Sequence, residues 1–287
     1  MSDITAHRAN SPPARNAYGA MCAEVYVLDK PPGALFDSGY YLEQLKAIDG
    51  PVLEAASGSG RLHIPLLEAG LDLQGFDRSE HMMAECQAEA QRRGLAPRLS
   101  RQSFQSFAYD QPFAAIICPA GAFTLIEDFG EALAVLKRFF AHLRPGGRLF
   151  IDMMPLAYLA QVRDGVRSWT TPQGDLLQID SRGVELDWLT QRRVSHDRYE
   201  RWRGGRLIEQ ELEILCVRCW GLKEFEMALR EAGFGEISVC GDYRLGRPPR
   251  PSDRQWCFGF RWRSAETFVP RVAPRSRRRH QAAVRRI

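Results

Sequence analysis

The residues best suited to chemistry begin in a glycine-rich stretch in the first quarter of the chain. Gly58 and Gly60 separate a compact apolar run, residues 52–56, from a helical pattern that starts at Arg61. Glycine lets a backbone approach a ligand closely, and the N-terminus of the following helix would face that ligand. His63 stands where the dinucleotide-binding fingerprint has its third glycine, which disfavours a dinucleotide enzyme because the pyrophosphate would lose its seat. A plain tight turn is the alternative interpretation.

A carboxylate ends the next apolar run. Asp77 lies 17 residues beyond Gly60, at the end of the stretch Gly75-Phe76-Asp77. At the switch point of a parallel sheet, a carboxylate in this position accepts hydrogen bonds from both hydroxyls of a ribose. Taken alone, Asp77 could instead cap the following helix. Its pairing with the glycine turn favours the ribose role.

Short apolar runs alternate with amphipathic ones between Pro51 and Met154, which predicts strands alternating with helices. Such alternation implies a parallel sheet with right-handed crossovers, so the expected fold class is α/β with a doubly wound sheet. The expected strands are residues 52–56, 71–76, 96–102, 113–118 and 148–153, and the expected helices are residues 61–69, 80–93 and 129–143, the last stopped by residues 144–147.

The pattern changes after Pro155. A short helix is expected over residues 156–162, and polar and apolar residues then alternate from Leu176 to Cys219. This alternation predicts an antiparallel meander with one wet face, with turns at Arg182-Gly183 and Gly204-Gly205. A helix over residues 222–232 and two strands, residues 236–240 and 255–262, complete the prediction.

Composition limits the class of protein. The 287 residues are 45% hydrophobic and 26% charged, which excludes collagen, a disulfide scaffold and disorder throughout. The net charge of +4 belongs to the C-terminal end, since residues 264–287 carry seven arginines against Glu266 and sum to +6, leaving −2 for the body. A slightly acidic body disfavours a nucleic-acid-binding surface. The basic tail is predicted to be solvated and disordered.

Neither an export signal nor a membrane span is evident in the sequence. The longest apolar stretch, residues 113–126, is interrupted by Pro119 and Gly121 and is shorter than the ~20 residues that a spanning helix needs. The seven cysteines are odd in number and scattered, which indicates reduced thiols and a cytoplasmic location. Cys216 and Cys219 form a lone C-x-x-C without a second pair, so no metal site is predicted.

Four segments of the chain occur in a characteristic order. They are the glycine turn of residues 53–61, the stretch Gly75-Phe76-Asp77-Arg78-Ser79 followed by Met82, the stretch Leu143-Arg144-Pro145-Gly146-Gly147, and residues 229–234. This set resembles the class I S-adenosylmethionine-dependent methyltransferases of small-molecule type, over roughly Tyr18 to Trp262. The resemblance implies a seven-stranded Rossmann-like sheet closed by an antiparallel hairpin, with the meander inserted on the acceptor side.

The resemblance also assigns roles to residues, with S-adenosylmethionine as the cofactor. Asp77 would hold the ribose, and the glycine turn would face the methionine end. The implied cofactor contacts are Glu54, Ala56, Gly58 and Gly60 at the methionine end, Asp77 at the ribose, Arg78, Met82, Gln102 and Ser103 around the adenine, and Pro119 and Ala120 beneath the sulfonium.

Two residues depart from the family's pattern. Ala56 stands where the family usually has glycine, so the backbone has less room there. Phe104 stands where an acidic residue is common, so the adenine amino group would lack its usual acceptor. We therefore expect weaker or differently oriented cofactor binding. After the fourth strand, Cys118-Pro119-Ala120-Gly121 matches neither the nucleic-acid amino methyltransferases nor the cytosine-C5 enzymes, which favours a small-molecule acceptor.

Candidates for the acceptor side come from the N-terminal segment and from the meander. Methyl transfer from a sulfonium is an in-line displacement, and a base is needed only if the acceptor arrives protonated. For each candidate, a core or solvated role is the competing interpretation. The catalytic candidates are Tyr18, Tyr26 and His196, Lys30 belongs to the same lid as the tyrosines, and the substrate-binding candidates are Phe123, Trp169, Arg193, Tyr199 and Tyr243.

The predicted organisation has five parts. Residues 1–50 form a lid or helical segment, 51–155 the cofactor-binding core, 156–220 the acceptor-side insertion, 221–263 the closing helix and hairpin, and 264–287 the tail. The predicted function is methyl transfer to a nitrogen or oxygen nucleophile of a small molecule in specialised metabolism, and the sequence is compatible with a homodimer. The alternatives are another reaction of S-adenosylmethionine that releases methylthioadenosine, and a non-catalytic binding module.

Overall fold

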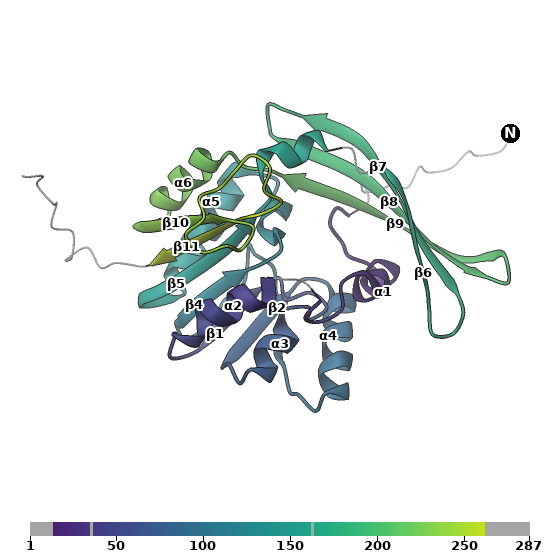
Figure 1. Cartoon of the computed structure of the whole chain (residues 1–287), viewed down its shortest axis with the longest axis horizontal. Coiled ribbons are helices and arrows are strands. Elements are labelled where there is room, and N and C mark those ends of the chain that lie inside the picture. Colours follow the sequence, from purple (N-terminus) through teal and green to yellow (C-terminus); the bar gives the residue numbers. More distant parts are fainter. Residues whose placement is uncertain (1–13, 35–36, 162–163, 262–287) are drawn as a thin grey trace, which may run out of the picture.

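The computed structural model describes residues 14–34, 37–161 and 164–261, which form two sheets with helices around them (Figure 1). The larger sheet has seven strands in the order β10-β11-β5-β4-β1-β2-β3. Its strands are β1 (Val52–Ala55), β2 (Leu73–Asp77), β3 (Arg98–Arg101), β4 (Phe113–Cys118), β5 (Leu143–Met153), β10 (Glu236–Gly241) and β11 (Trp256–Arg261). The doubly wound α/β sheet predicted from the sequence is confirmed.

Parallel pairing runs through the sheet from β3 to β5, and β11 then reverses the strand direction. β11 pairs antiparallel with both β5 and β10, which closes the sheet with a hairpin. The helices around the sheet are α2 (Asp37–Lys46), α3 (His63–Glu68), α4 (Glu80–Arg92), α5 (Phe129–Ala141) and α6 (Leu222–Glu231). The carboxyl ends of β1, β2 and β4 therefore meet at one edge, the place where such sheets bind ligands.

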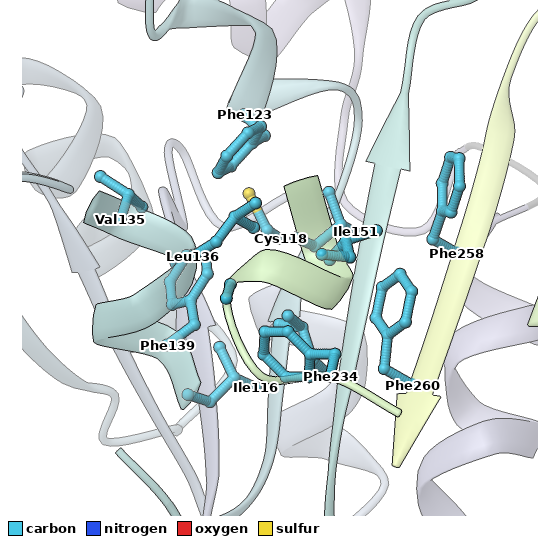
Figure 2. Close-up of a cluster of buried hydrophobic side chains, with 14 of the residues drawn as sticks. Ile116, Cys118, Phe123, Val135, Leu136, Phe139, Ile151, Phe234, Phe258 and Phe260 are labelled. Carbon is cyan, nitrogen blue, oxygen red and sulfur yellow. The ribbon is translucent and has the colours of Figure 1, made fainter. Parts of the chain in front are cut away.

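The apolar core lies between the sheet and the helices α5 and α6. Figure 2 shows Phe123, Leu136 and Phe139 pointing toward Cys118 of β4 and Ile151 of β5. β4 is buried at all six positions, as its uninterrupted apolar run predicts for a central strand. This packing holds the carboxyl ends of β4 and β5 rigidly in place.

The smaller sheet has four antiparallel strands in the order β6-β7-β8-β9. They are β6 (Gly165–Thr170), β7 (Leu176–Asp187), β8 (Arg192–Arg203) and β9 (Arg206–Arg218). Helix α1 (Ala20–Asp29) contacts α4 on one side and β8 and β9 on the other, so it joins the two sheets (Figure 1). Met21, Cys22 and Val25 of α1 pack against Leu177 and Tyr199 of the small sheet.

Several local predictions are corrected by the structure. Arg182-Gly183 is not a turn: it lies inside β7, where the register shifts between Gly183 and Glu185. The β7–β8 turn comes later, at residues 188–191, whereas the predicted turn at Gly204-Gly205 is confirmed. The sequence also missed β6, and residues 144–147, expected as a stop signal, belong to the start of β5. A glycine signals a bulge as well as a turn, because both need a backbone without a side chain.

Two further differences concern the ends of elements. The short helix expected over residues 156–162 is a 3₁₀ helix, Leu156–Ala160, and Val162 lies outside the described residues. The basic tail of residues 264–287 also lies outside them, as does Trp262. Among the residues in the described ranges, no helix is long and apolar enough to cross a membrane.

Candidate functional site

A cavity of about 800 Å³ lies between the two sheets. One side, here called the core half, is lined by residues at the carboxyl ends of β1, β2, β3 and β4. The other side, here called the meander half, is lined by α1 and by residues of β6–β9. The predicted cofactor residues lie in the core half, and all of them except Gly60 line the cavity directly.

The glycine turn adopts the left-handed backbone conformation that the sequence predicts. Gly58 has φ of 55° and Gly60 has φ of 83°. A Cβ at Gly60 would lie 2.6 Å from Cys86 Sγ of α4, whereas a Cβ at Gly58 would meet no atom within 4 Å. Gly60 therefore lets α4 pack against the turn, and Gly58 keeps the backbone open toward the cavity.

Non-glycine residues around the cavity also have positive φ. Tyr18, Ala56 and Ala120 have φ of 52°, 57° and 56°, and all three line the cavity. Each such residue costs on the order of 1 kcal/mol relative to an ordinary backbone conformation. The crowded backbone expected at Ala56, where the family usually has glycine, thus takes the form of a left-handed conformation, which recurs at other positions of the same cavity.

Asp77 is held in place by backbone amides. Its Oδ2 accepts a hydrogen bond from Gly58 N at 2.9 Å, and its Oδ1 accepts one from Ser79 N at 2.8 Å. The cap of α4 is Ser79, whose side chain accepts from Met82 N, so the capping role considered for Asp77 is not its own. Burial raises the pKa of the Asp77 carboxyl, and the amide bonds oppose this shift. Each oxygen keeps a lone pair that a ribose hydroxyl can use.

His63 stands where the dinucleotide-binding fingerprint has its third glycine, and the structure shows how the imidazole is accommodated. His63 is fully buried, and its Nδ1 lies 2.8 Å from Oε2 of Glu54. A Cβ on Gly75 of β2 would lie 2.9 Å from His63 Cε1, so Gly75 makes the room that the imidazole occupies. Helix α3 thus packs on the sheet through His63 instead of a glycine. Burial raises the pKa of Glu54, and the contact with His63 opposes that shift.

A buried ion pair beside the turn escaped the sequence analysis. Arg61 Nη1 donates to Asp37 Oδ1 at 2.8 Å, and both side chains are at least 95% buried. Arg61 also lines the cavity, while Asp37 belongs to α2. The pair fixes α2 against the glycine turn. Nothing in the local sequence signals this pairing, because its partners lie 24 residues apart on separate elements.

The floor of the core half is supported from beneath by a buried carboxylate. Asp152 Oδ2 accepts hydrogen bonds from Ala120 N at 2.9 Å and from the Tyr243 hydroxyl at 2.7 Å. Burial raises the pKa of Asp152 to about 6, against the opposing effect of these hydrogen bonds. Tyr243, expected in the acceptor pocket, does not line the cavity. It contacts the support of Pro119 and Ala120 instead.

The adenine-side candidates occupy one rim of the core half. Arg78, Met82, Gln102 and Ser103 all line the cavity. The Gln102 side chain is already engaged, since it donates to Ser100 Oγ at 2.9 Å and accepts from Ala108 N at 2.9 Å. Phe104 also lines the cavity, where it presents an apolar ring in place of an acceptor. Adenine would therefore be held here largely by apolar contact.

The acceptor-side candidates divide into two groups. Tyr18, Tyr26, Arg193 and Tyr199 line the meander half, as does Lys30. Phe123 points into the core cluster, and Trp169 packs beside α1; neither lines the cavity (Figure 2).

The alternation of a strand explains where His196 lies. Side chains on β8 point alternately to the two faces of the sheet, and Ser195 and Asp197 line the cavity on either side of His196. His196 therefore faces away from the cavity and is not placed to act as the base. Counting alternate residues of β8 from Arg193 to Tyr199, both predicted to bind substrate, places Asp197 on the same face and so identifies it as a cavity residue.

Glu213 of β9 is a further residue of the site that the sequence does not signal. Its two carboxylate oxygens accept hydrogen bonds from Ala17 N at 2.7 Å and from Tyr18 N at 2.8 Å. This contact attaches the N-terminal segment to the meander and holds Tyr18 over the cavity. It joins residues 195 or more positions apart, which no local pattern can reveal.

The residues of the core half fit a ligand with a ribose and a methionine-like chain. Ser57 Oγ is buried and has no hydrogen-bond partner among the residues that the structure describes, although Ser57 lines the cavity. Next to it, Gly58 opens onto free space and the Asp77 carboxylate faces the rim. An orphaned hydroxyl beside an open backbone and a fixed carboxylate is the arrangement that a polar ligand completes. Within the described ranges, no three His, Cys, Asp or Glu side chains are grouped to hold a metal ion.

The chain is similar to known methyltransferases. Residues 52–147 match the methyltransferase domain family. The chain is 23% identical to the putative methyltransferase YqeM of Bacillus subtilis (strain 168) over 220 residues, which are 77% of this chain and 86% of the relative. It is 31% identical to a glycine/sarcosine N-methyltransferase of Parasynechococcus marenigrum (strain WH8102) over 196 residues, 67% of this chain and 66% of the relative.

A solved structure shares the fold. The X-ray structure of the sugar N-methyltransferase KedS8 from Streptoalloteichus sp ATCC 53650 superposes with a TM-score of 0.66 at 18% identity. The match covers 92% of this chain and 100% of the other. The likeness therefore extends beyond the seven-stranded sheet to most of the described chain.

Proposed function

The chain belongs to the class I S-adenosylmethionine-dependent methyltransferases, and from this premise we propose that it methylates a nitrogen or oxygen nucleophile of a small molecule. The proposed reaction belongs to specialised metabolism and takes place in the cytoplasm. The observation that carries the proposal is the single cavity that runs from the glycine turn and Asp77 to the meander. Cofactor and acceptor would then meet inside one continuous cavity.

The names of the relatives support a nitrogen acceptor of low molecular weight. One relative is named a glycine/sarcosine N-methyltransferase and the structural neighbour a sugar N-methyltransferase. The cavity of about 800 Å³ has room for a nucleoside cofactor and a small acceptor together. The seven cysteines, all free thiols, accord with a reducing compartment.

The chain's own residues would contribute alignment and the exclusion of water. When bound, S-adenosylmethionine supplies an electrophilic methyl group. Asp77 would hold the ribose, Ser57 and Gly58 would border the methionine chain, and Ala120, fixed by Asp152, would form the floor. Tyr18 and Tyr26 would cover the reacting atoms from the side of α1. Holding reactants in line in a water-poor space lowers the barrier because their orientation is established before reaction.

Product analysis tests this function directly. The chain is incubated with S-adenosylmethionine and a panel of small amines, phenols and alcohols, and the nucleoside products are separated. We expect acceptor-dependent formation of S-adenosylhomocysteine. Methylthioadenosine as the product would instead indicate attack on the aminobutyryl chain, and no binding of either nucleoside in a calorimeter would indicate a non-catalytic module on this fold.

A further inference from the structure

Arg193 of β8 is a buried cation without a counter-ion. It is 8% exposed and lines the meander half of the cavity. Its Nη1 donates to the backbone oxygen of Gln161, and no carboxylate among the described residues forms an ion pair with it. Burying a guanidinium without an anionic partner is costly. The remaining donors of Arg193 are therefore suited to an anionic group that enters the cavity.

The neighbouring strand leaves space for this guanidinium. A Cβ on Gly183 of β7 would lie 3.2 Å from Arg193 Nη2, so a larger residue would crowd it. Gly183 pairs with Ser195, two residues beyond Arg193 along β8. The side chain of Arg193 thus reaches along the strand toward Asp197. Asp197 lies two residues beyond Ser195, a distance of about 7 Å at 3.3 Å per residue.

Asp197 is a second buried charge on β8 that has no ion-pair partner among the described residues. It is 8% exposed, lines the cavity, and forms no ion pair with any described side chain. It lies directly opposite Glu213 of β9, a second carboxylate facing the cavity. Glu213 accepts hydrogen bonds from Ala17 N and Tyr18 N, whereas Asp197 accepts one from the Ser181 hydroxyl and none from a backbone amide of the described residues. No described side chain forms an ion pair with either of these facing carboxylates, so a cationic group in the cavity would complete them.

We propose that the acceptor is an amine that also carries an anionic group, with Arg193 binding the carboxylate or phosphate and Asp197 the amine. This inference rests on the proposed function and narrows its substrate class. The opposite charges lie on one face of one strand, so they select a molecule by the separation of its two charged groups. A neutral amine would leave Arg193 unpaired, and an anion without an amine would leave Asp197 unpaired.

The chemistry balances with Asp197 as the base. A protonated amine has no lone pair, so its proton moves first to the carboxylate of Asp197. The freed nitrogen then bonds to the methyl carbon, the carbon–sulfur bond breaks, and its electron pair stays on sulfur to give S-adenosylhomocysteine. Burial raises the pKa of Asp197, and the hydrogen bond from Ser181 and the charges of Arg167, Arg193 and His196 oppose this shift. Glu213 faces it from β9 and Ser181 from β7.

Matched acceptor pairs test the inference. Release of S-adenosylhomocysteine is measured with 4-aminobutyrate against propylamine for the carboxylate, and with glucosamine 6-phosphate against glucosamine for the phosphate. We expect at least one anionic member to react about 10- to 100-fold faster than its neutral counterpart, the range for charge-assisted hydrogen bonds. The pair that shows the preference identifies which anion Arg193 binds.

Variants assign the preference to the two side chains. Arg193→Gln should abolish the preference for the anionic member, whereas Arg198→Gln, on the opposite face of β8 and paired with Glu200, should retain it. Asp197→Asn should slow turnover most near neutral pH and least where the amine is already deprotonated, while Asp180→Asn on the outer face should change nothing. All four variants should bind S-adenosylhomocysteine like the wild type, which also verifies that they fold.

The possible results distinguish this inference from the proposed methyltransferase function on which it rests. Neutral amines reacting as fast as anionic ones, or Arg193→Gln keeping the preference, would contradict the inference. Turnover of phenols or alcohols with no turnover of any amine would also contradict it and would leave the proposed function standing. A wild-type protein that binds neither S-adenosylmethionine nor S-adenosylhomocysteine would contradict both.

Discussion

The two halves of the cavity are built in different ways. The core half consists mainly of backbone turns and strand ends, with Gly58, Gly60 and Asp77 close together in the sequence. The meander half consists of charged and aromatic side chains that alternate along strands and depend on distant partners, as when Glu213 holds Tyr18. The first kind of site is fixed by local conformation, and the second by which face of a strand each residue takes. We therefore expect mutations in the two halves to have different effects on stability and binding.

The largest effect should come from the glycine turn. Gly60→Ala adds a Cβ that would lie 2.6 Å from Cys86 Sγ, at a residue with φ of 83°. We expect it to lower the free energy of unfolding by about 2–4 kcal/mol, from overpacking and backbone strain together. Gly94→Ala is the matched control, because its φ is 68° and a Cβ there would meet no atom within 4 Å. Urea unfolding showing equal losses for both would contradict the packing role of Gly60.

The support beneath the core half should make stability depend on pH. The pKa of Asp152 is about 6 when folded, against 3.8 for an unperturbed aspartate. Between these values the folded state binds more protons than the unfolded chain, so the contribution of Asp152 to stability falls as pH rises from about 4 to 6. The expected fall is on the order of 2–3 kcal/mol.

Asp152→Asn removes the titration and should flatten that part of the pH profile. Urea unfolding of the wild type and the variant at a series of pH values gives the comparison. Identical pH dependence in both proteins would show that Asp152 does not titrate as its burial implies.

Cofactor affinity should respond next. Asp77→Ala removes the ribose acceptor, and we expect binding of S-adenosylhomocysteine to weaken by about 1–3 kcal/mol in a calorimeter. Asp72→Ala, at the exposed start of β2 where Asp72 pairs with Arg98, serves as the control and should bind normally. An unchanged dissociation constant for Asp77→Ala would refute the ribose assignment.

The smallest expected effect concerns Ala56. Replacing it with glycine relieves the backbone strain of a residue with φ of 57°. The resulting gain in folding stability is partly offset by the greater conformational entropy of the unfolded chain. We expect cofactor binding to tighten by less than about 1 kcal/mol. Gln191→Gly relieves the same φ in the β7–β8 turn, outside the cavity lining, and should leave cofactor binding unchanged. Weaker binding by Ala56→Gly would mean that the alanine methyl contributes a contact.

The contrast between the halves also explains what the sequence could reveal. The glycine turn, Asp77 and the fully apolar β4 carry their structural signal locally, so the sequence predicts the fold, and the predicted cofactor residues other than Gly60 line the cavity. The ion pair of Arg61 with Asp37 and the contact of Glu213 with Tyr18 join separate elements, and no local pattern predicts them. Residue type alone makes His196 a candidate base, but the period of β8 places it on the face away from the cavity. Anchoring that period on Arg193 would have led to Asp197 instead.

The most direct test of the two-half cavity is a crystal structure of the chain with S-adenosylhomocysteine. We expect ribose hydroxyls on the Asp77 carboxylate, the homocysteine chain along Ser57 and Gly58, and the sulfur above Ala120 facing the meander half. A nucleoside bound outside this cavity, or a sulfur directed away from Arg193 and Asp197, would contradict it.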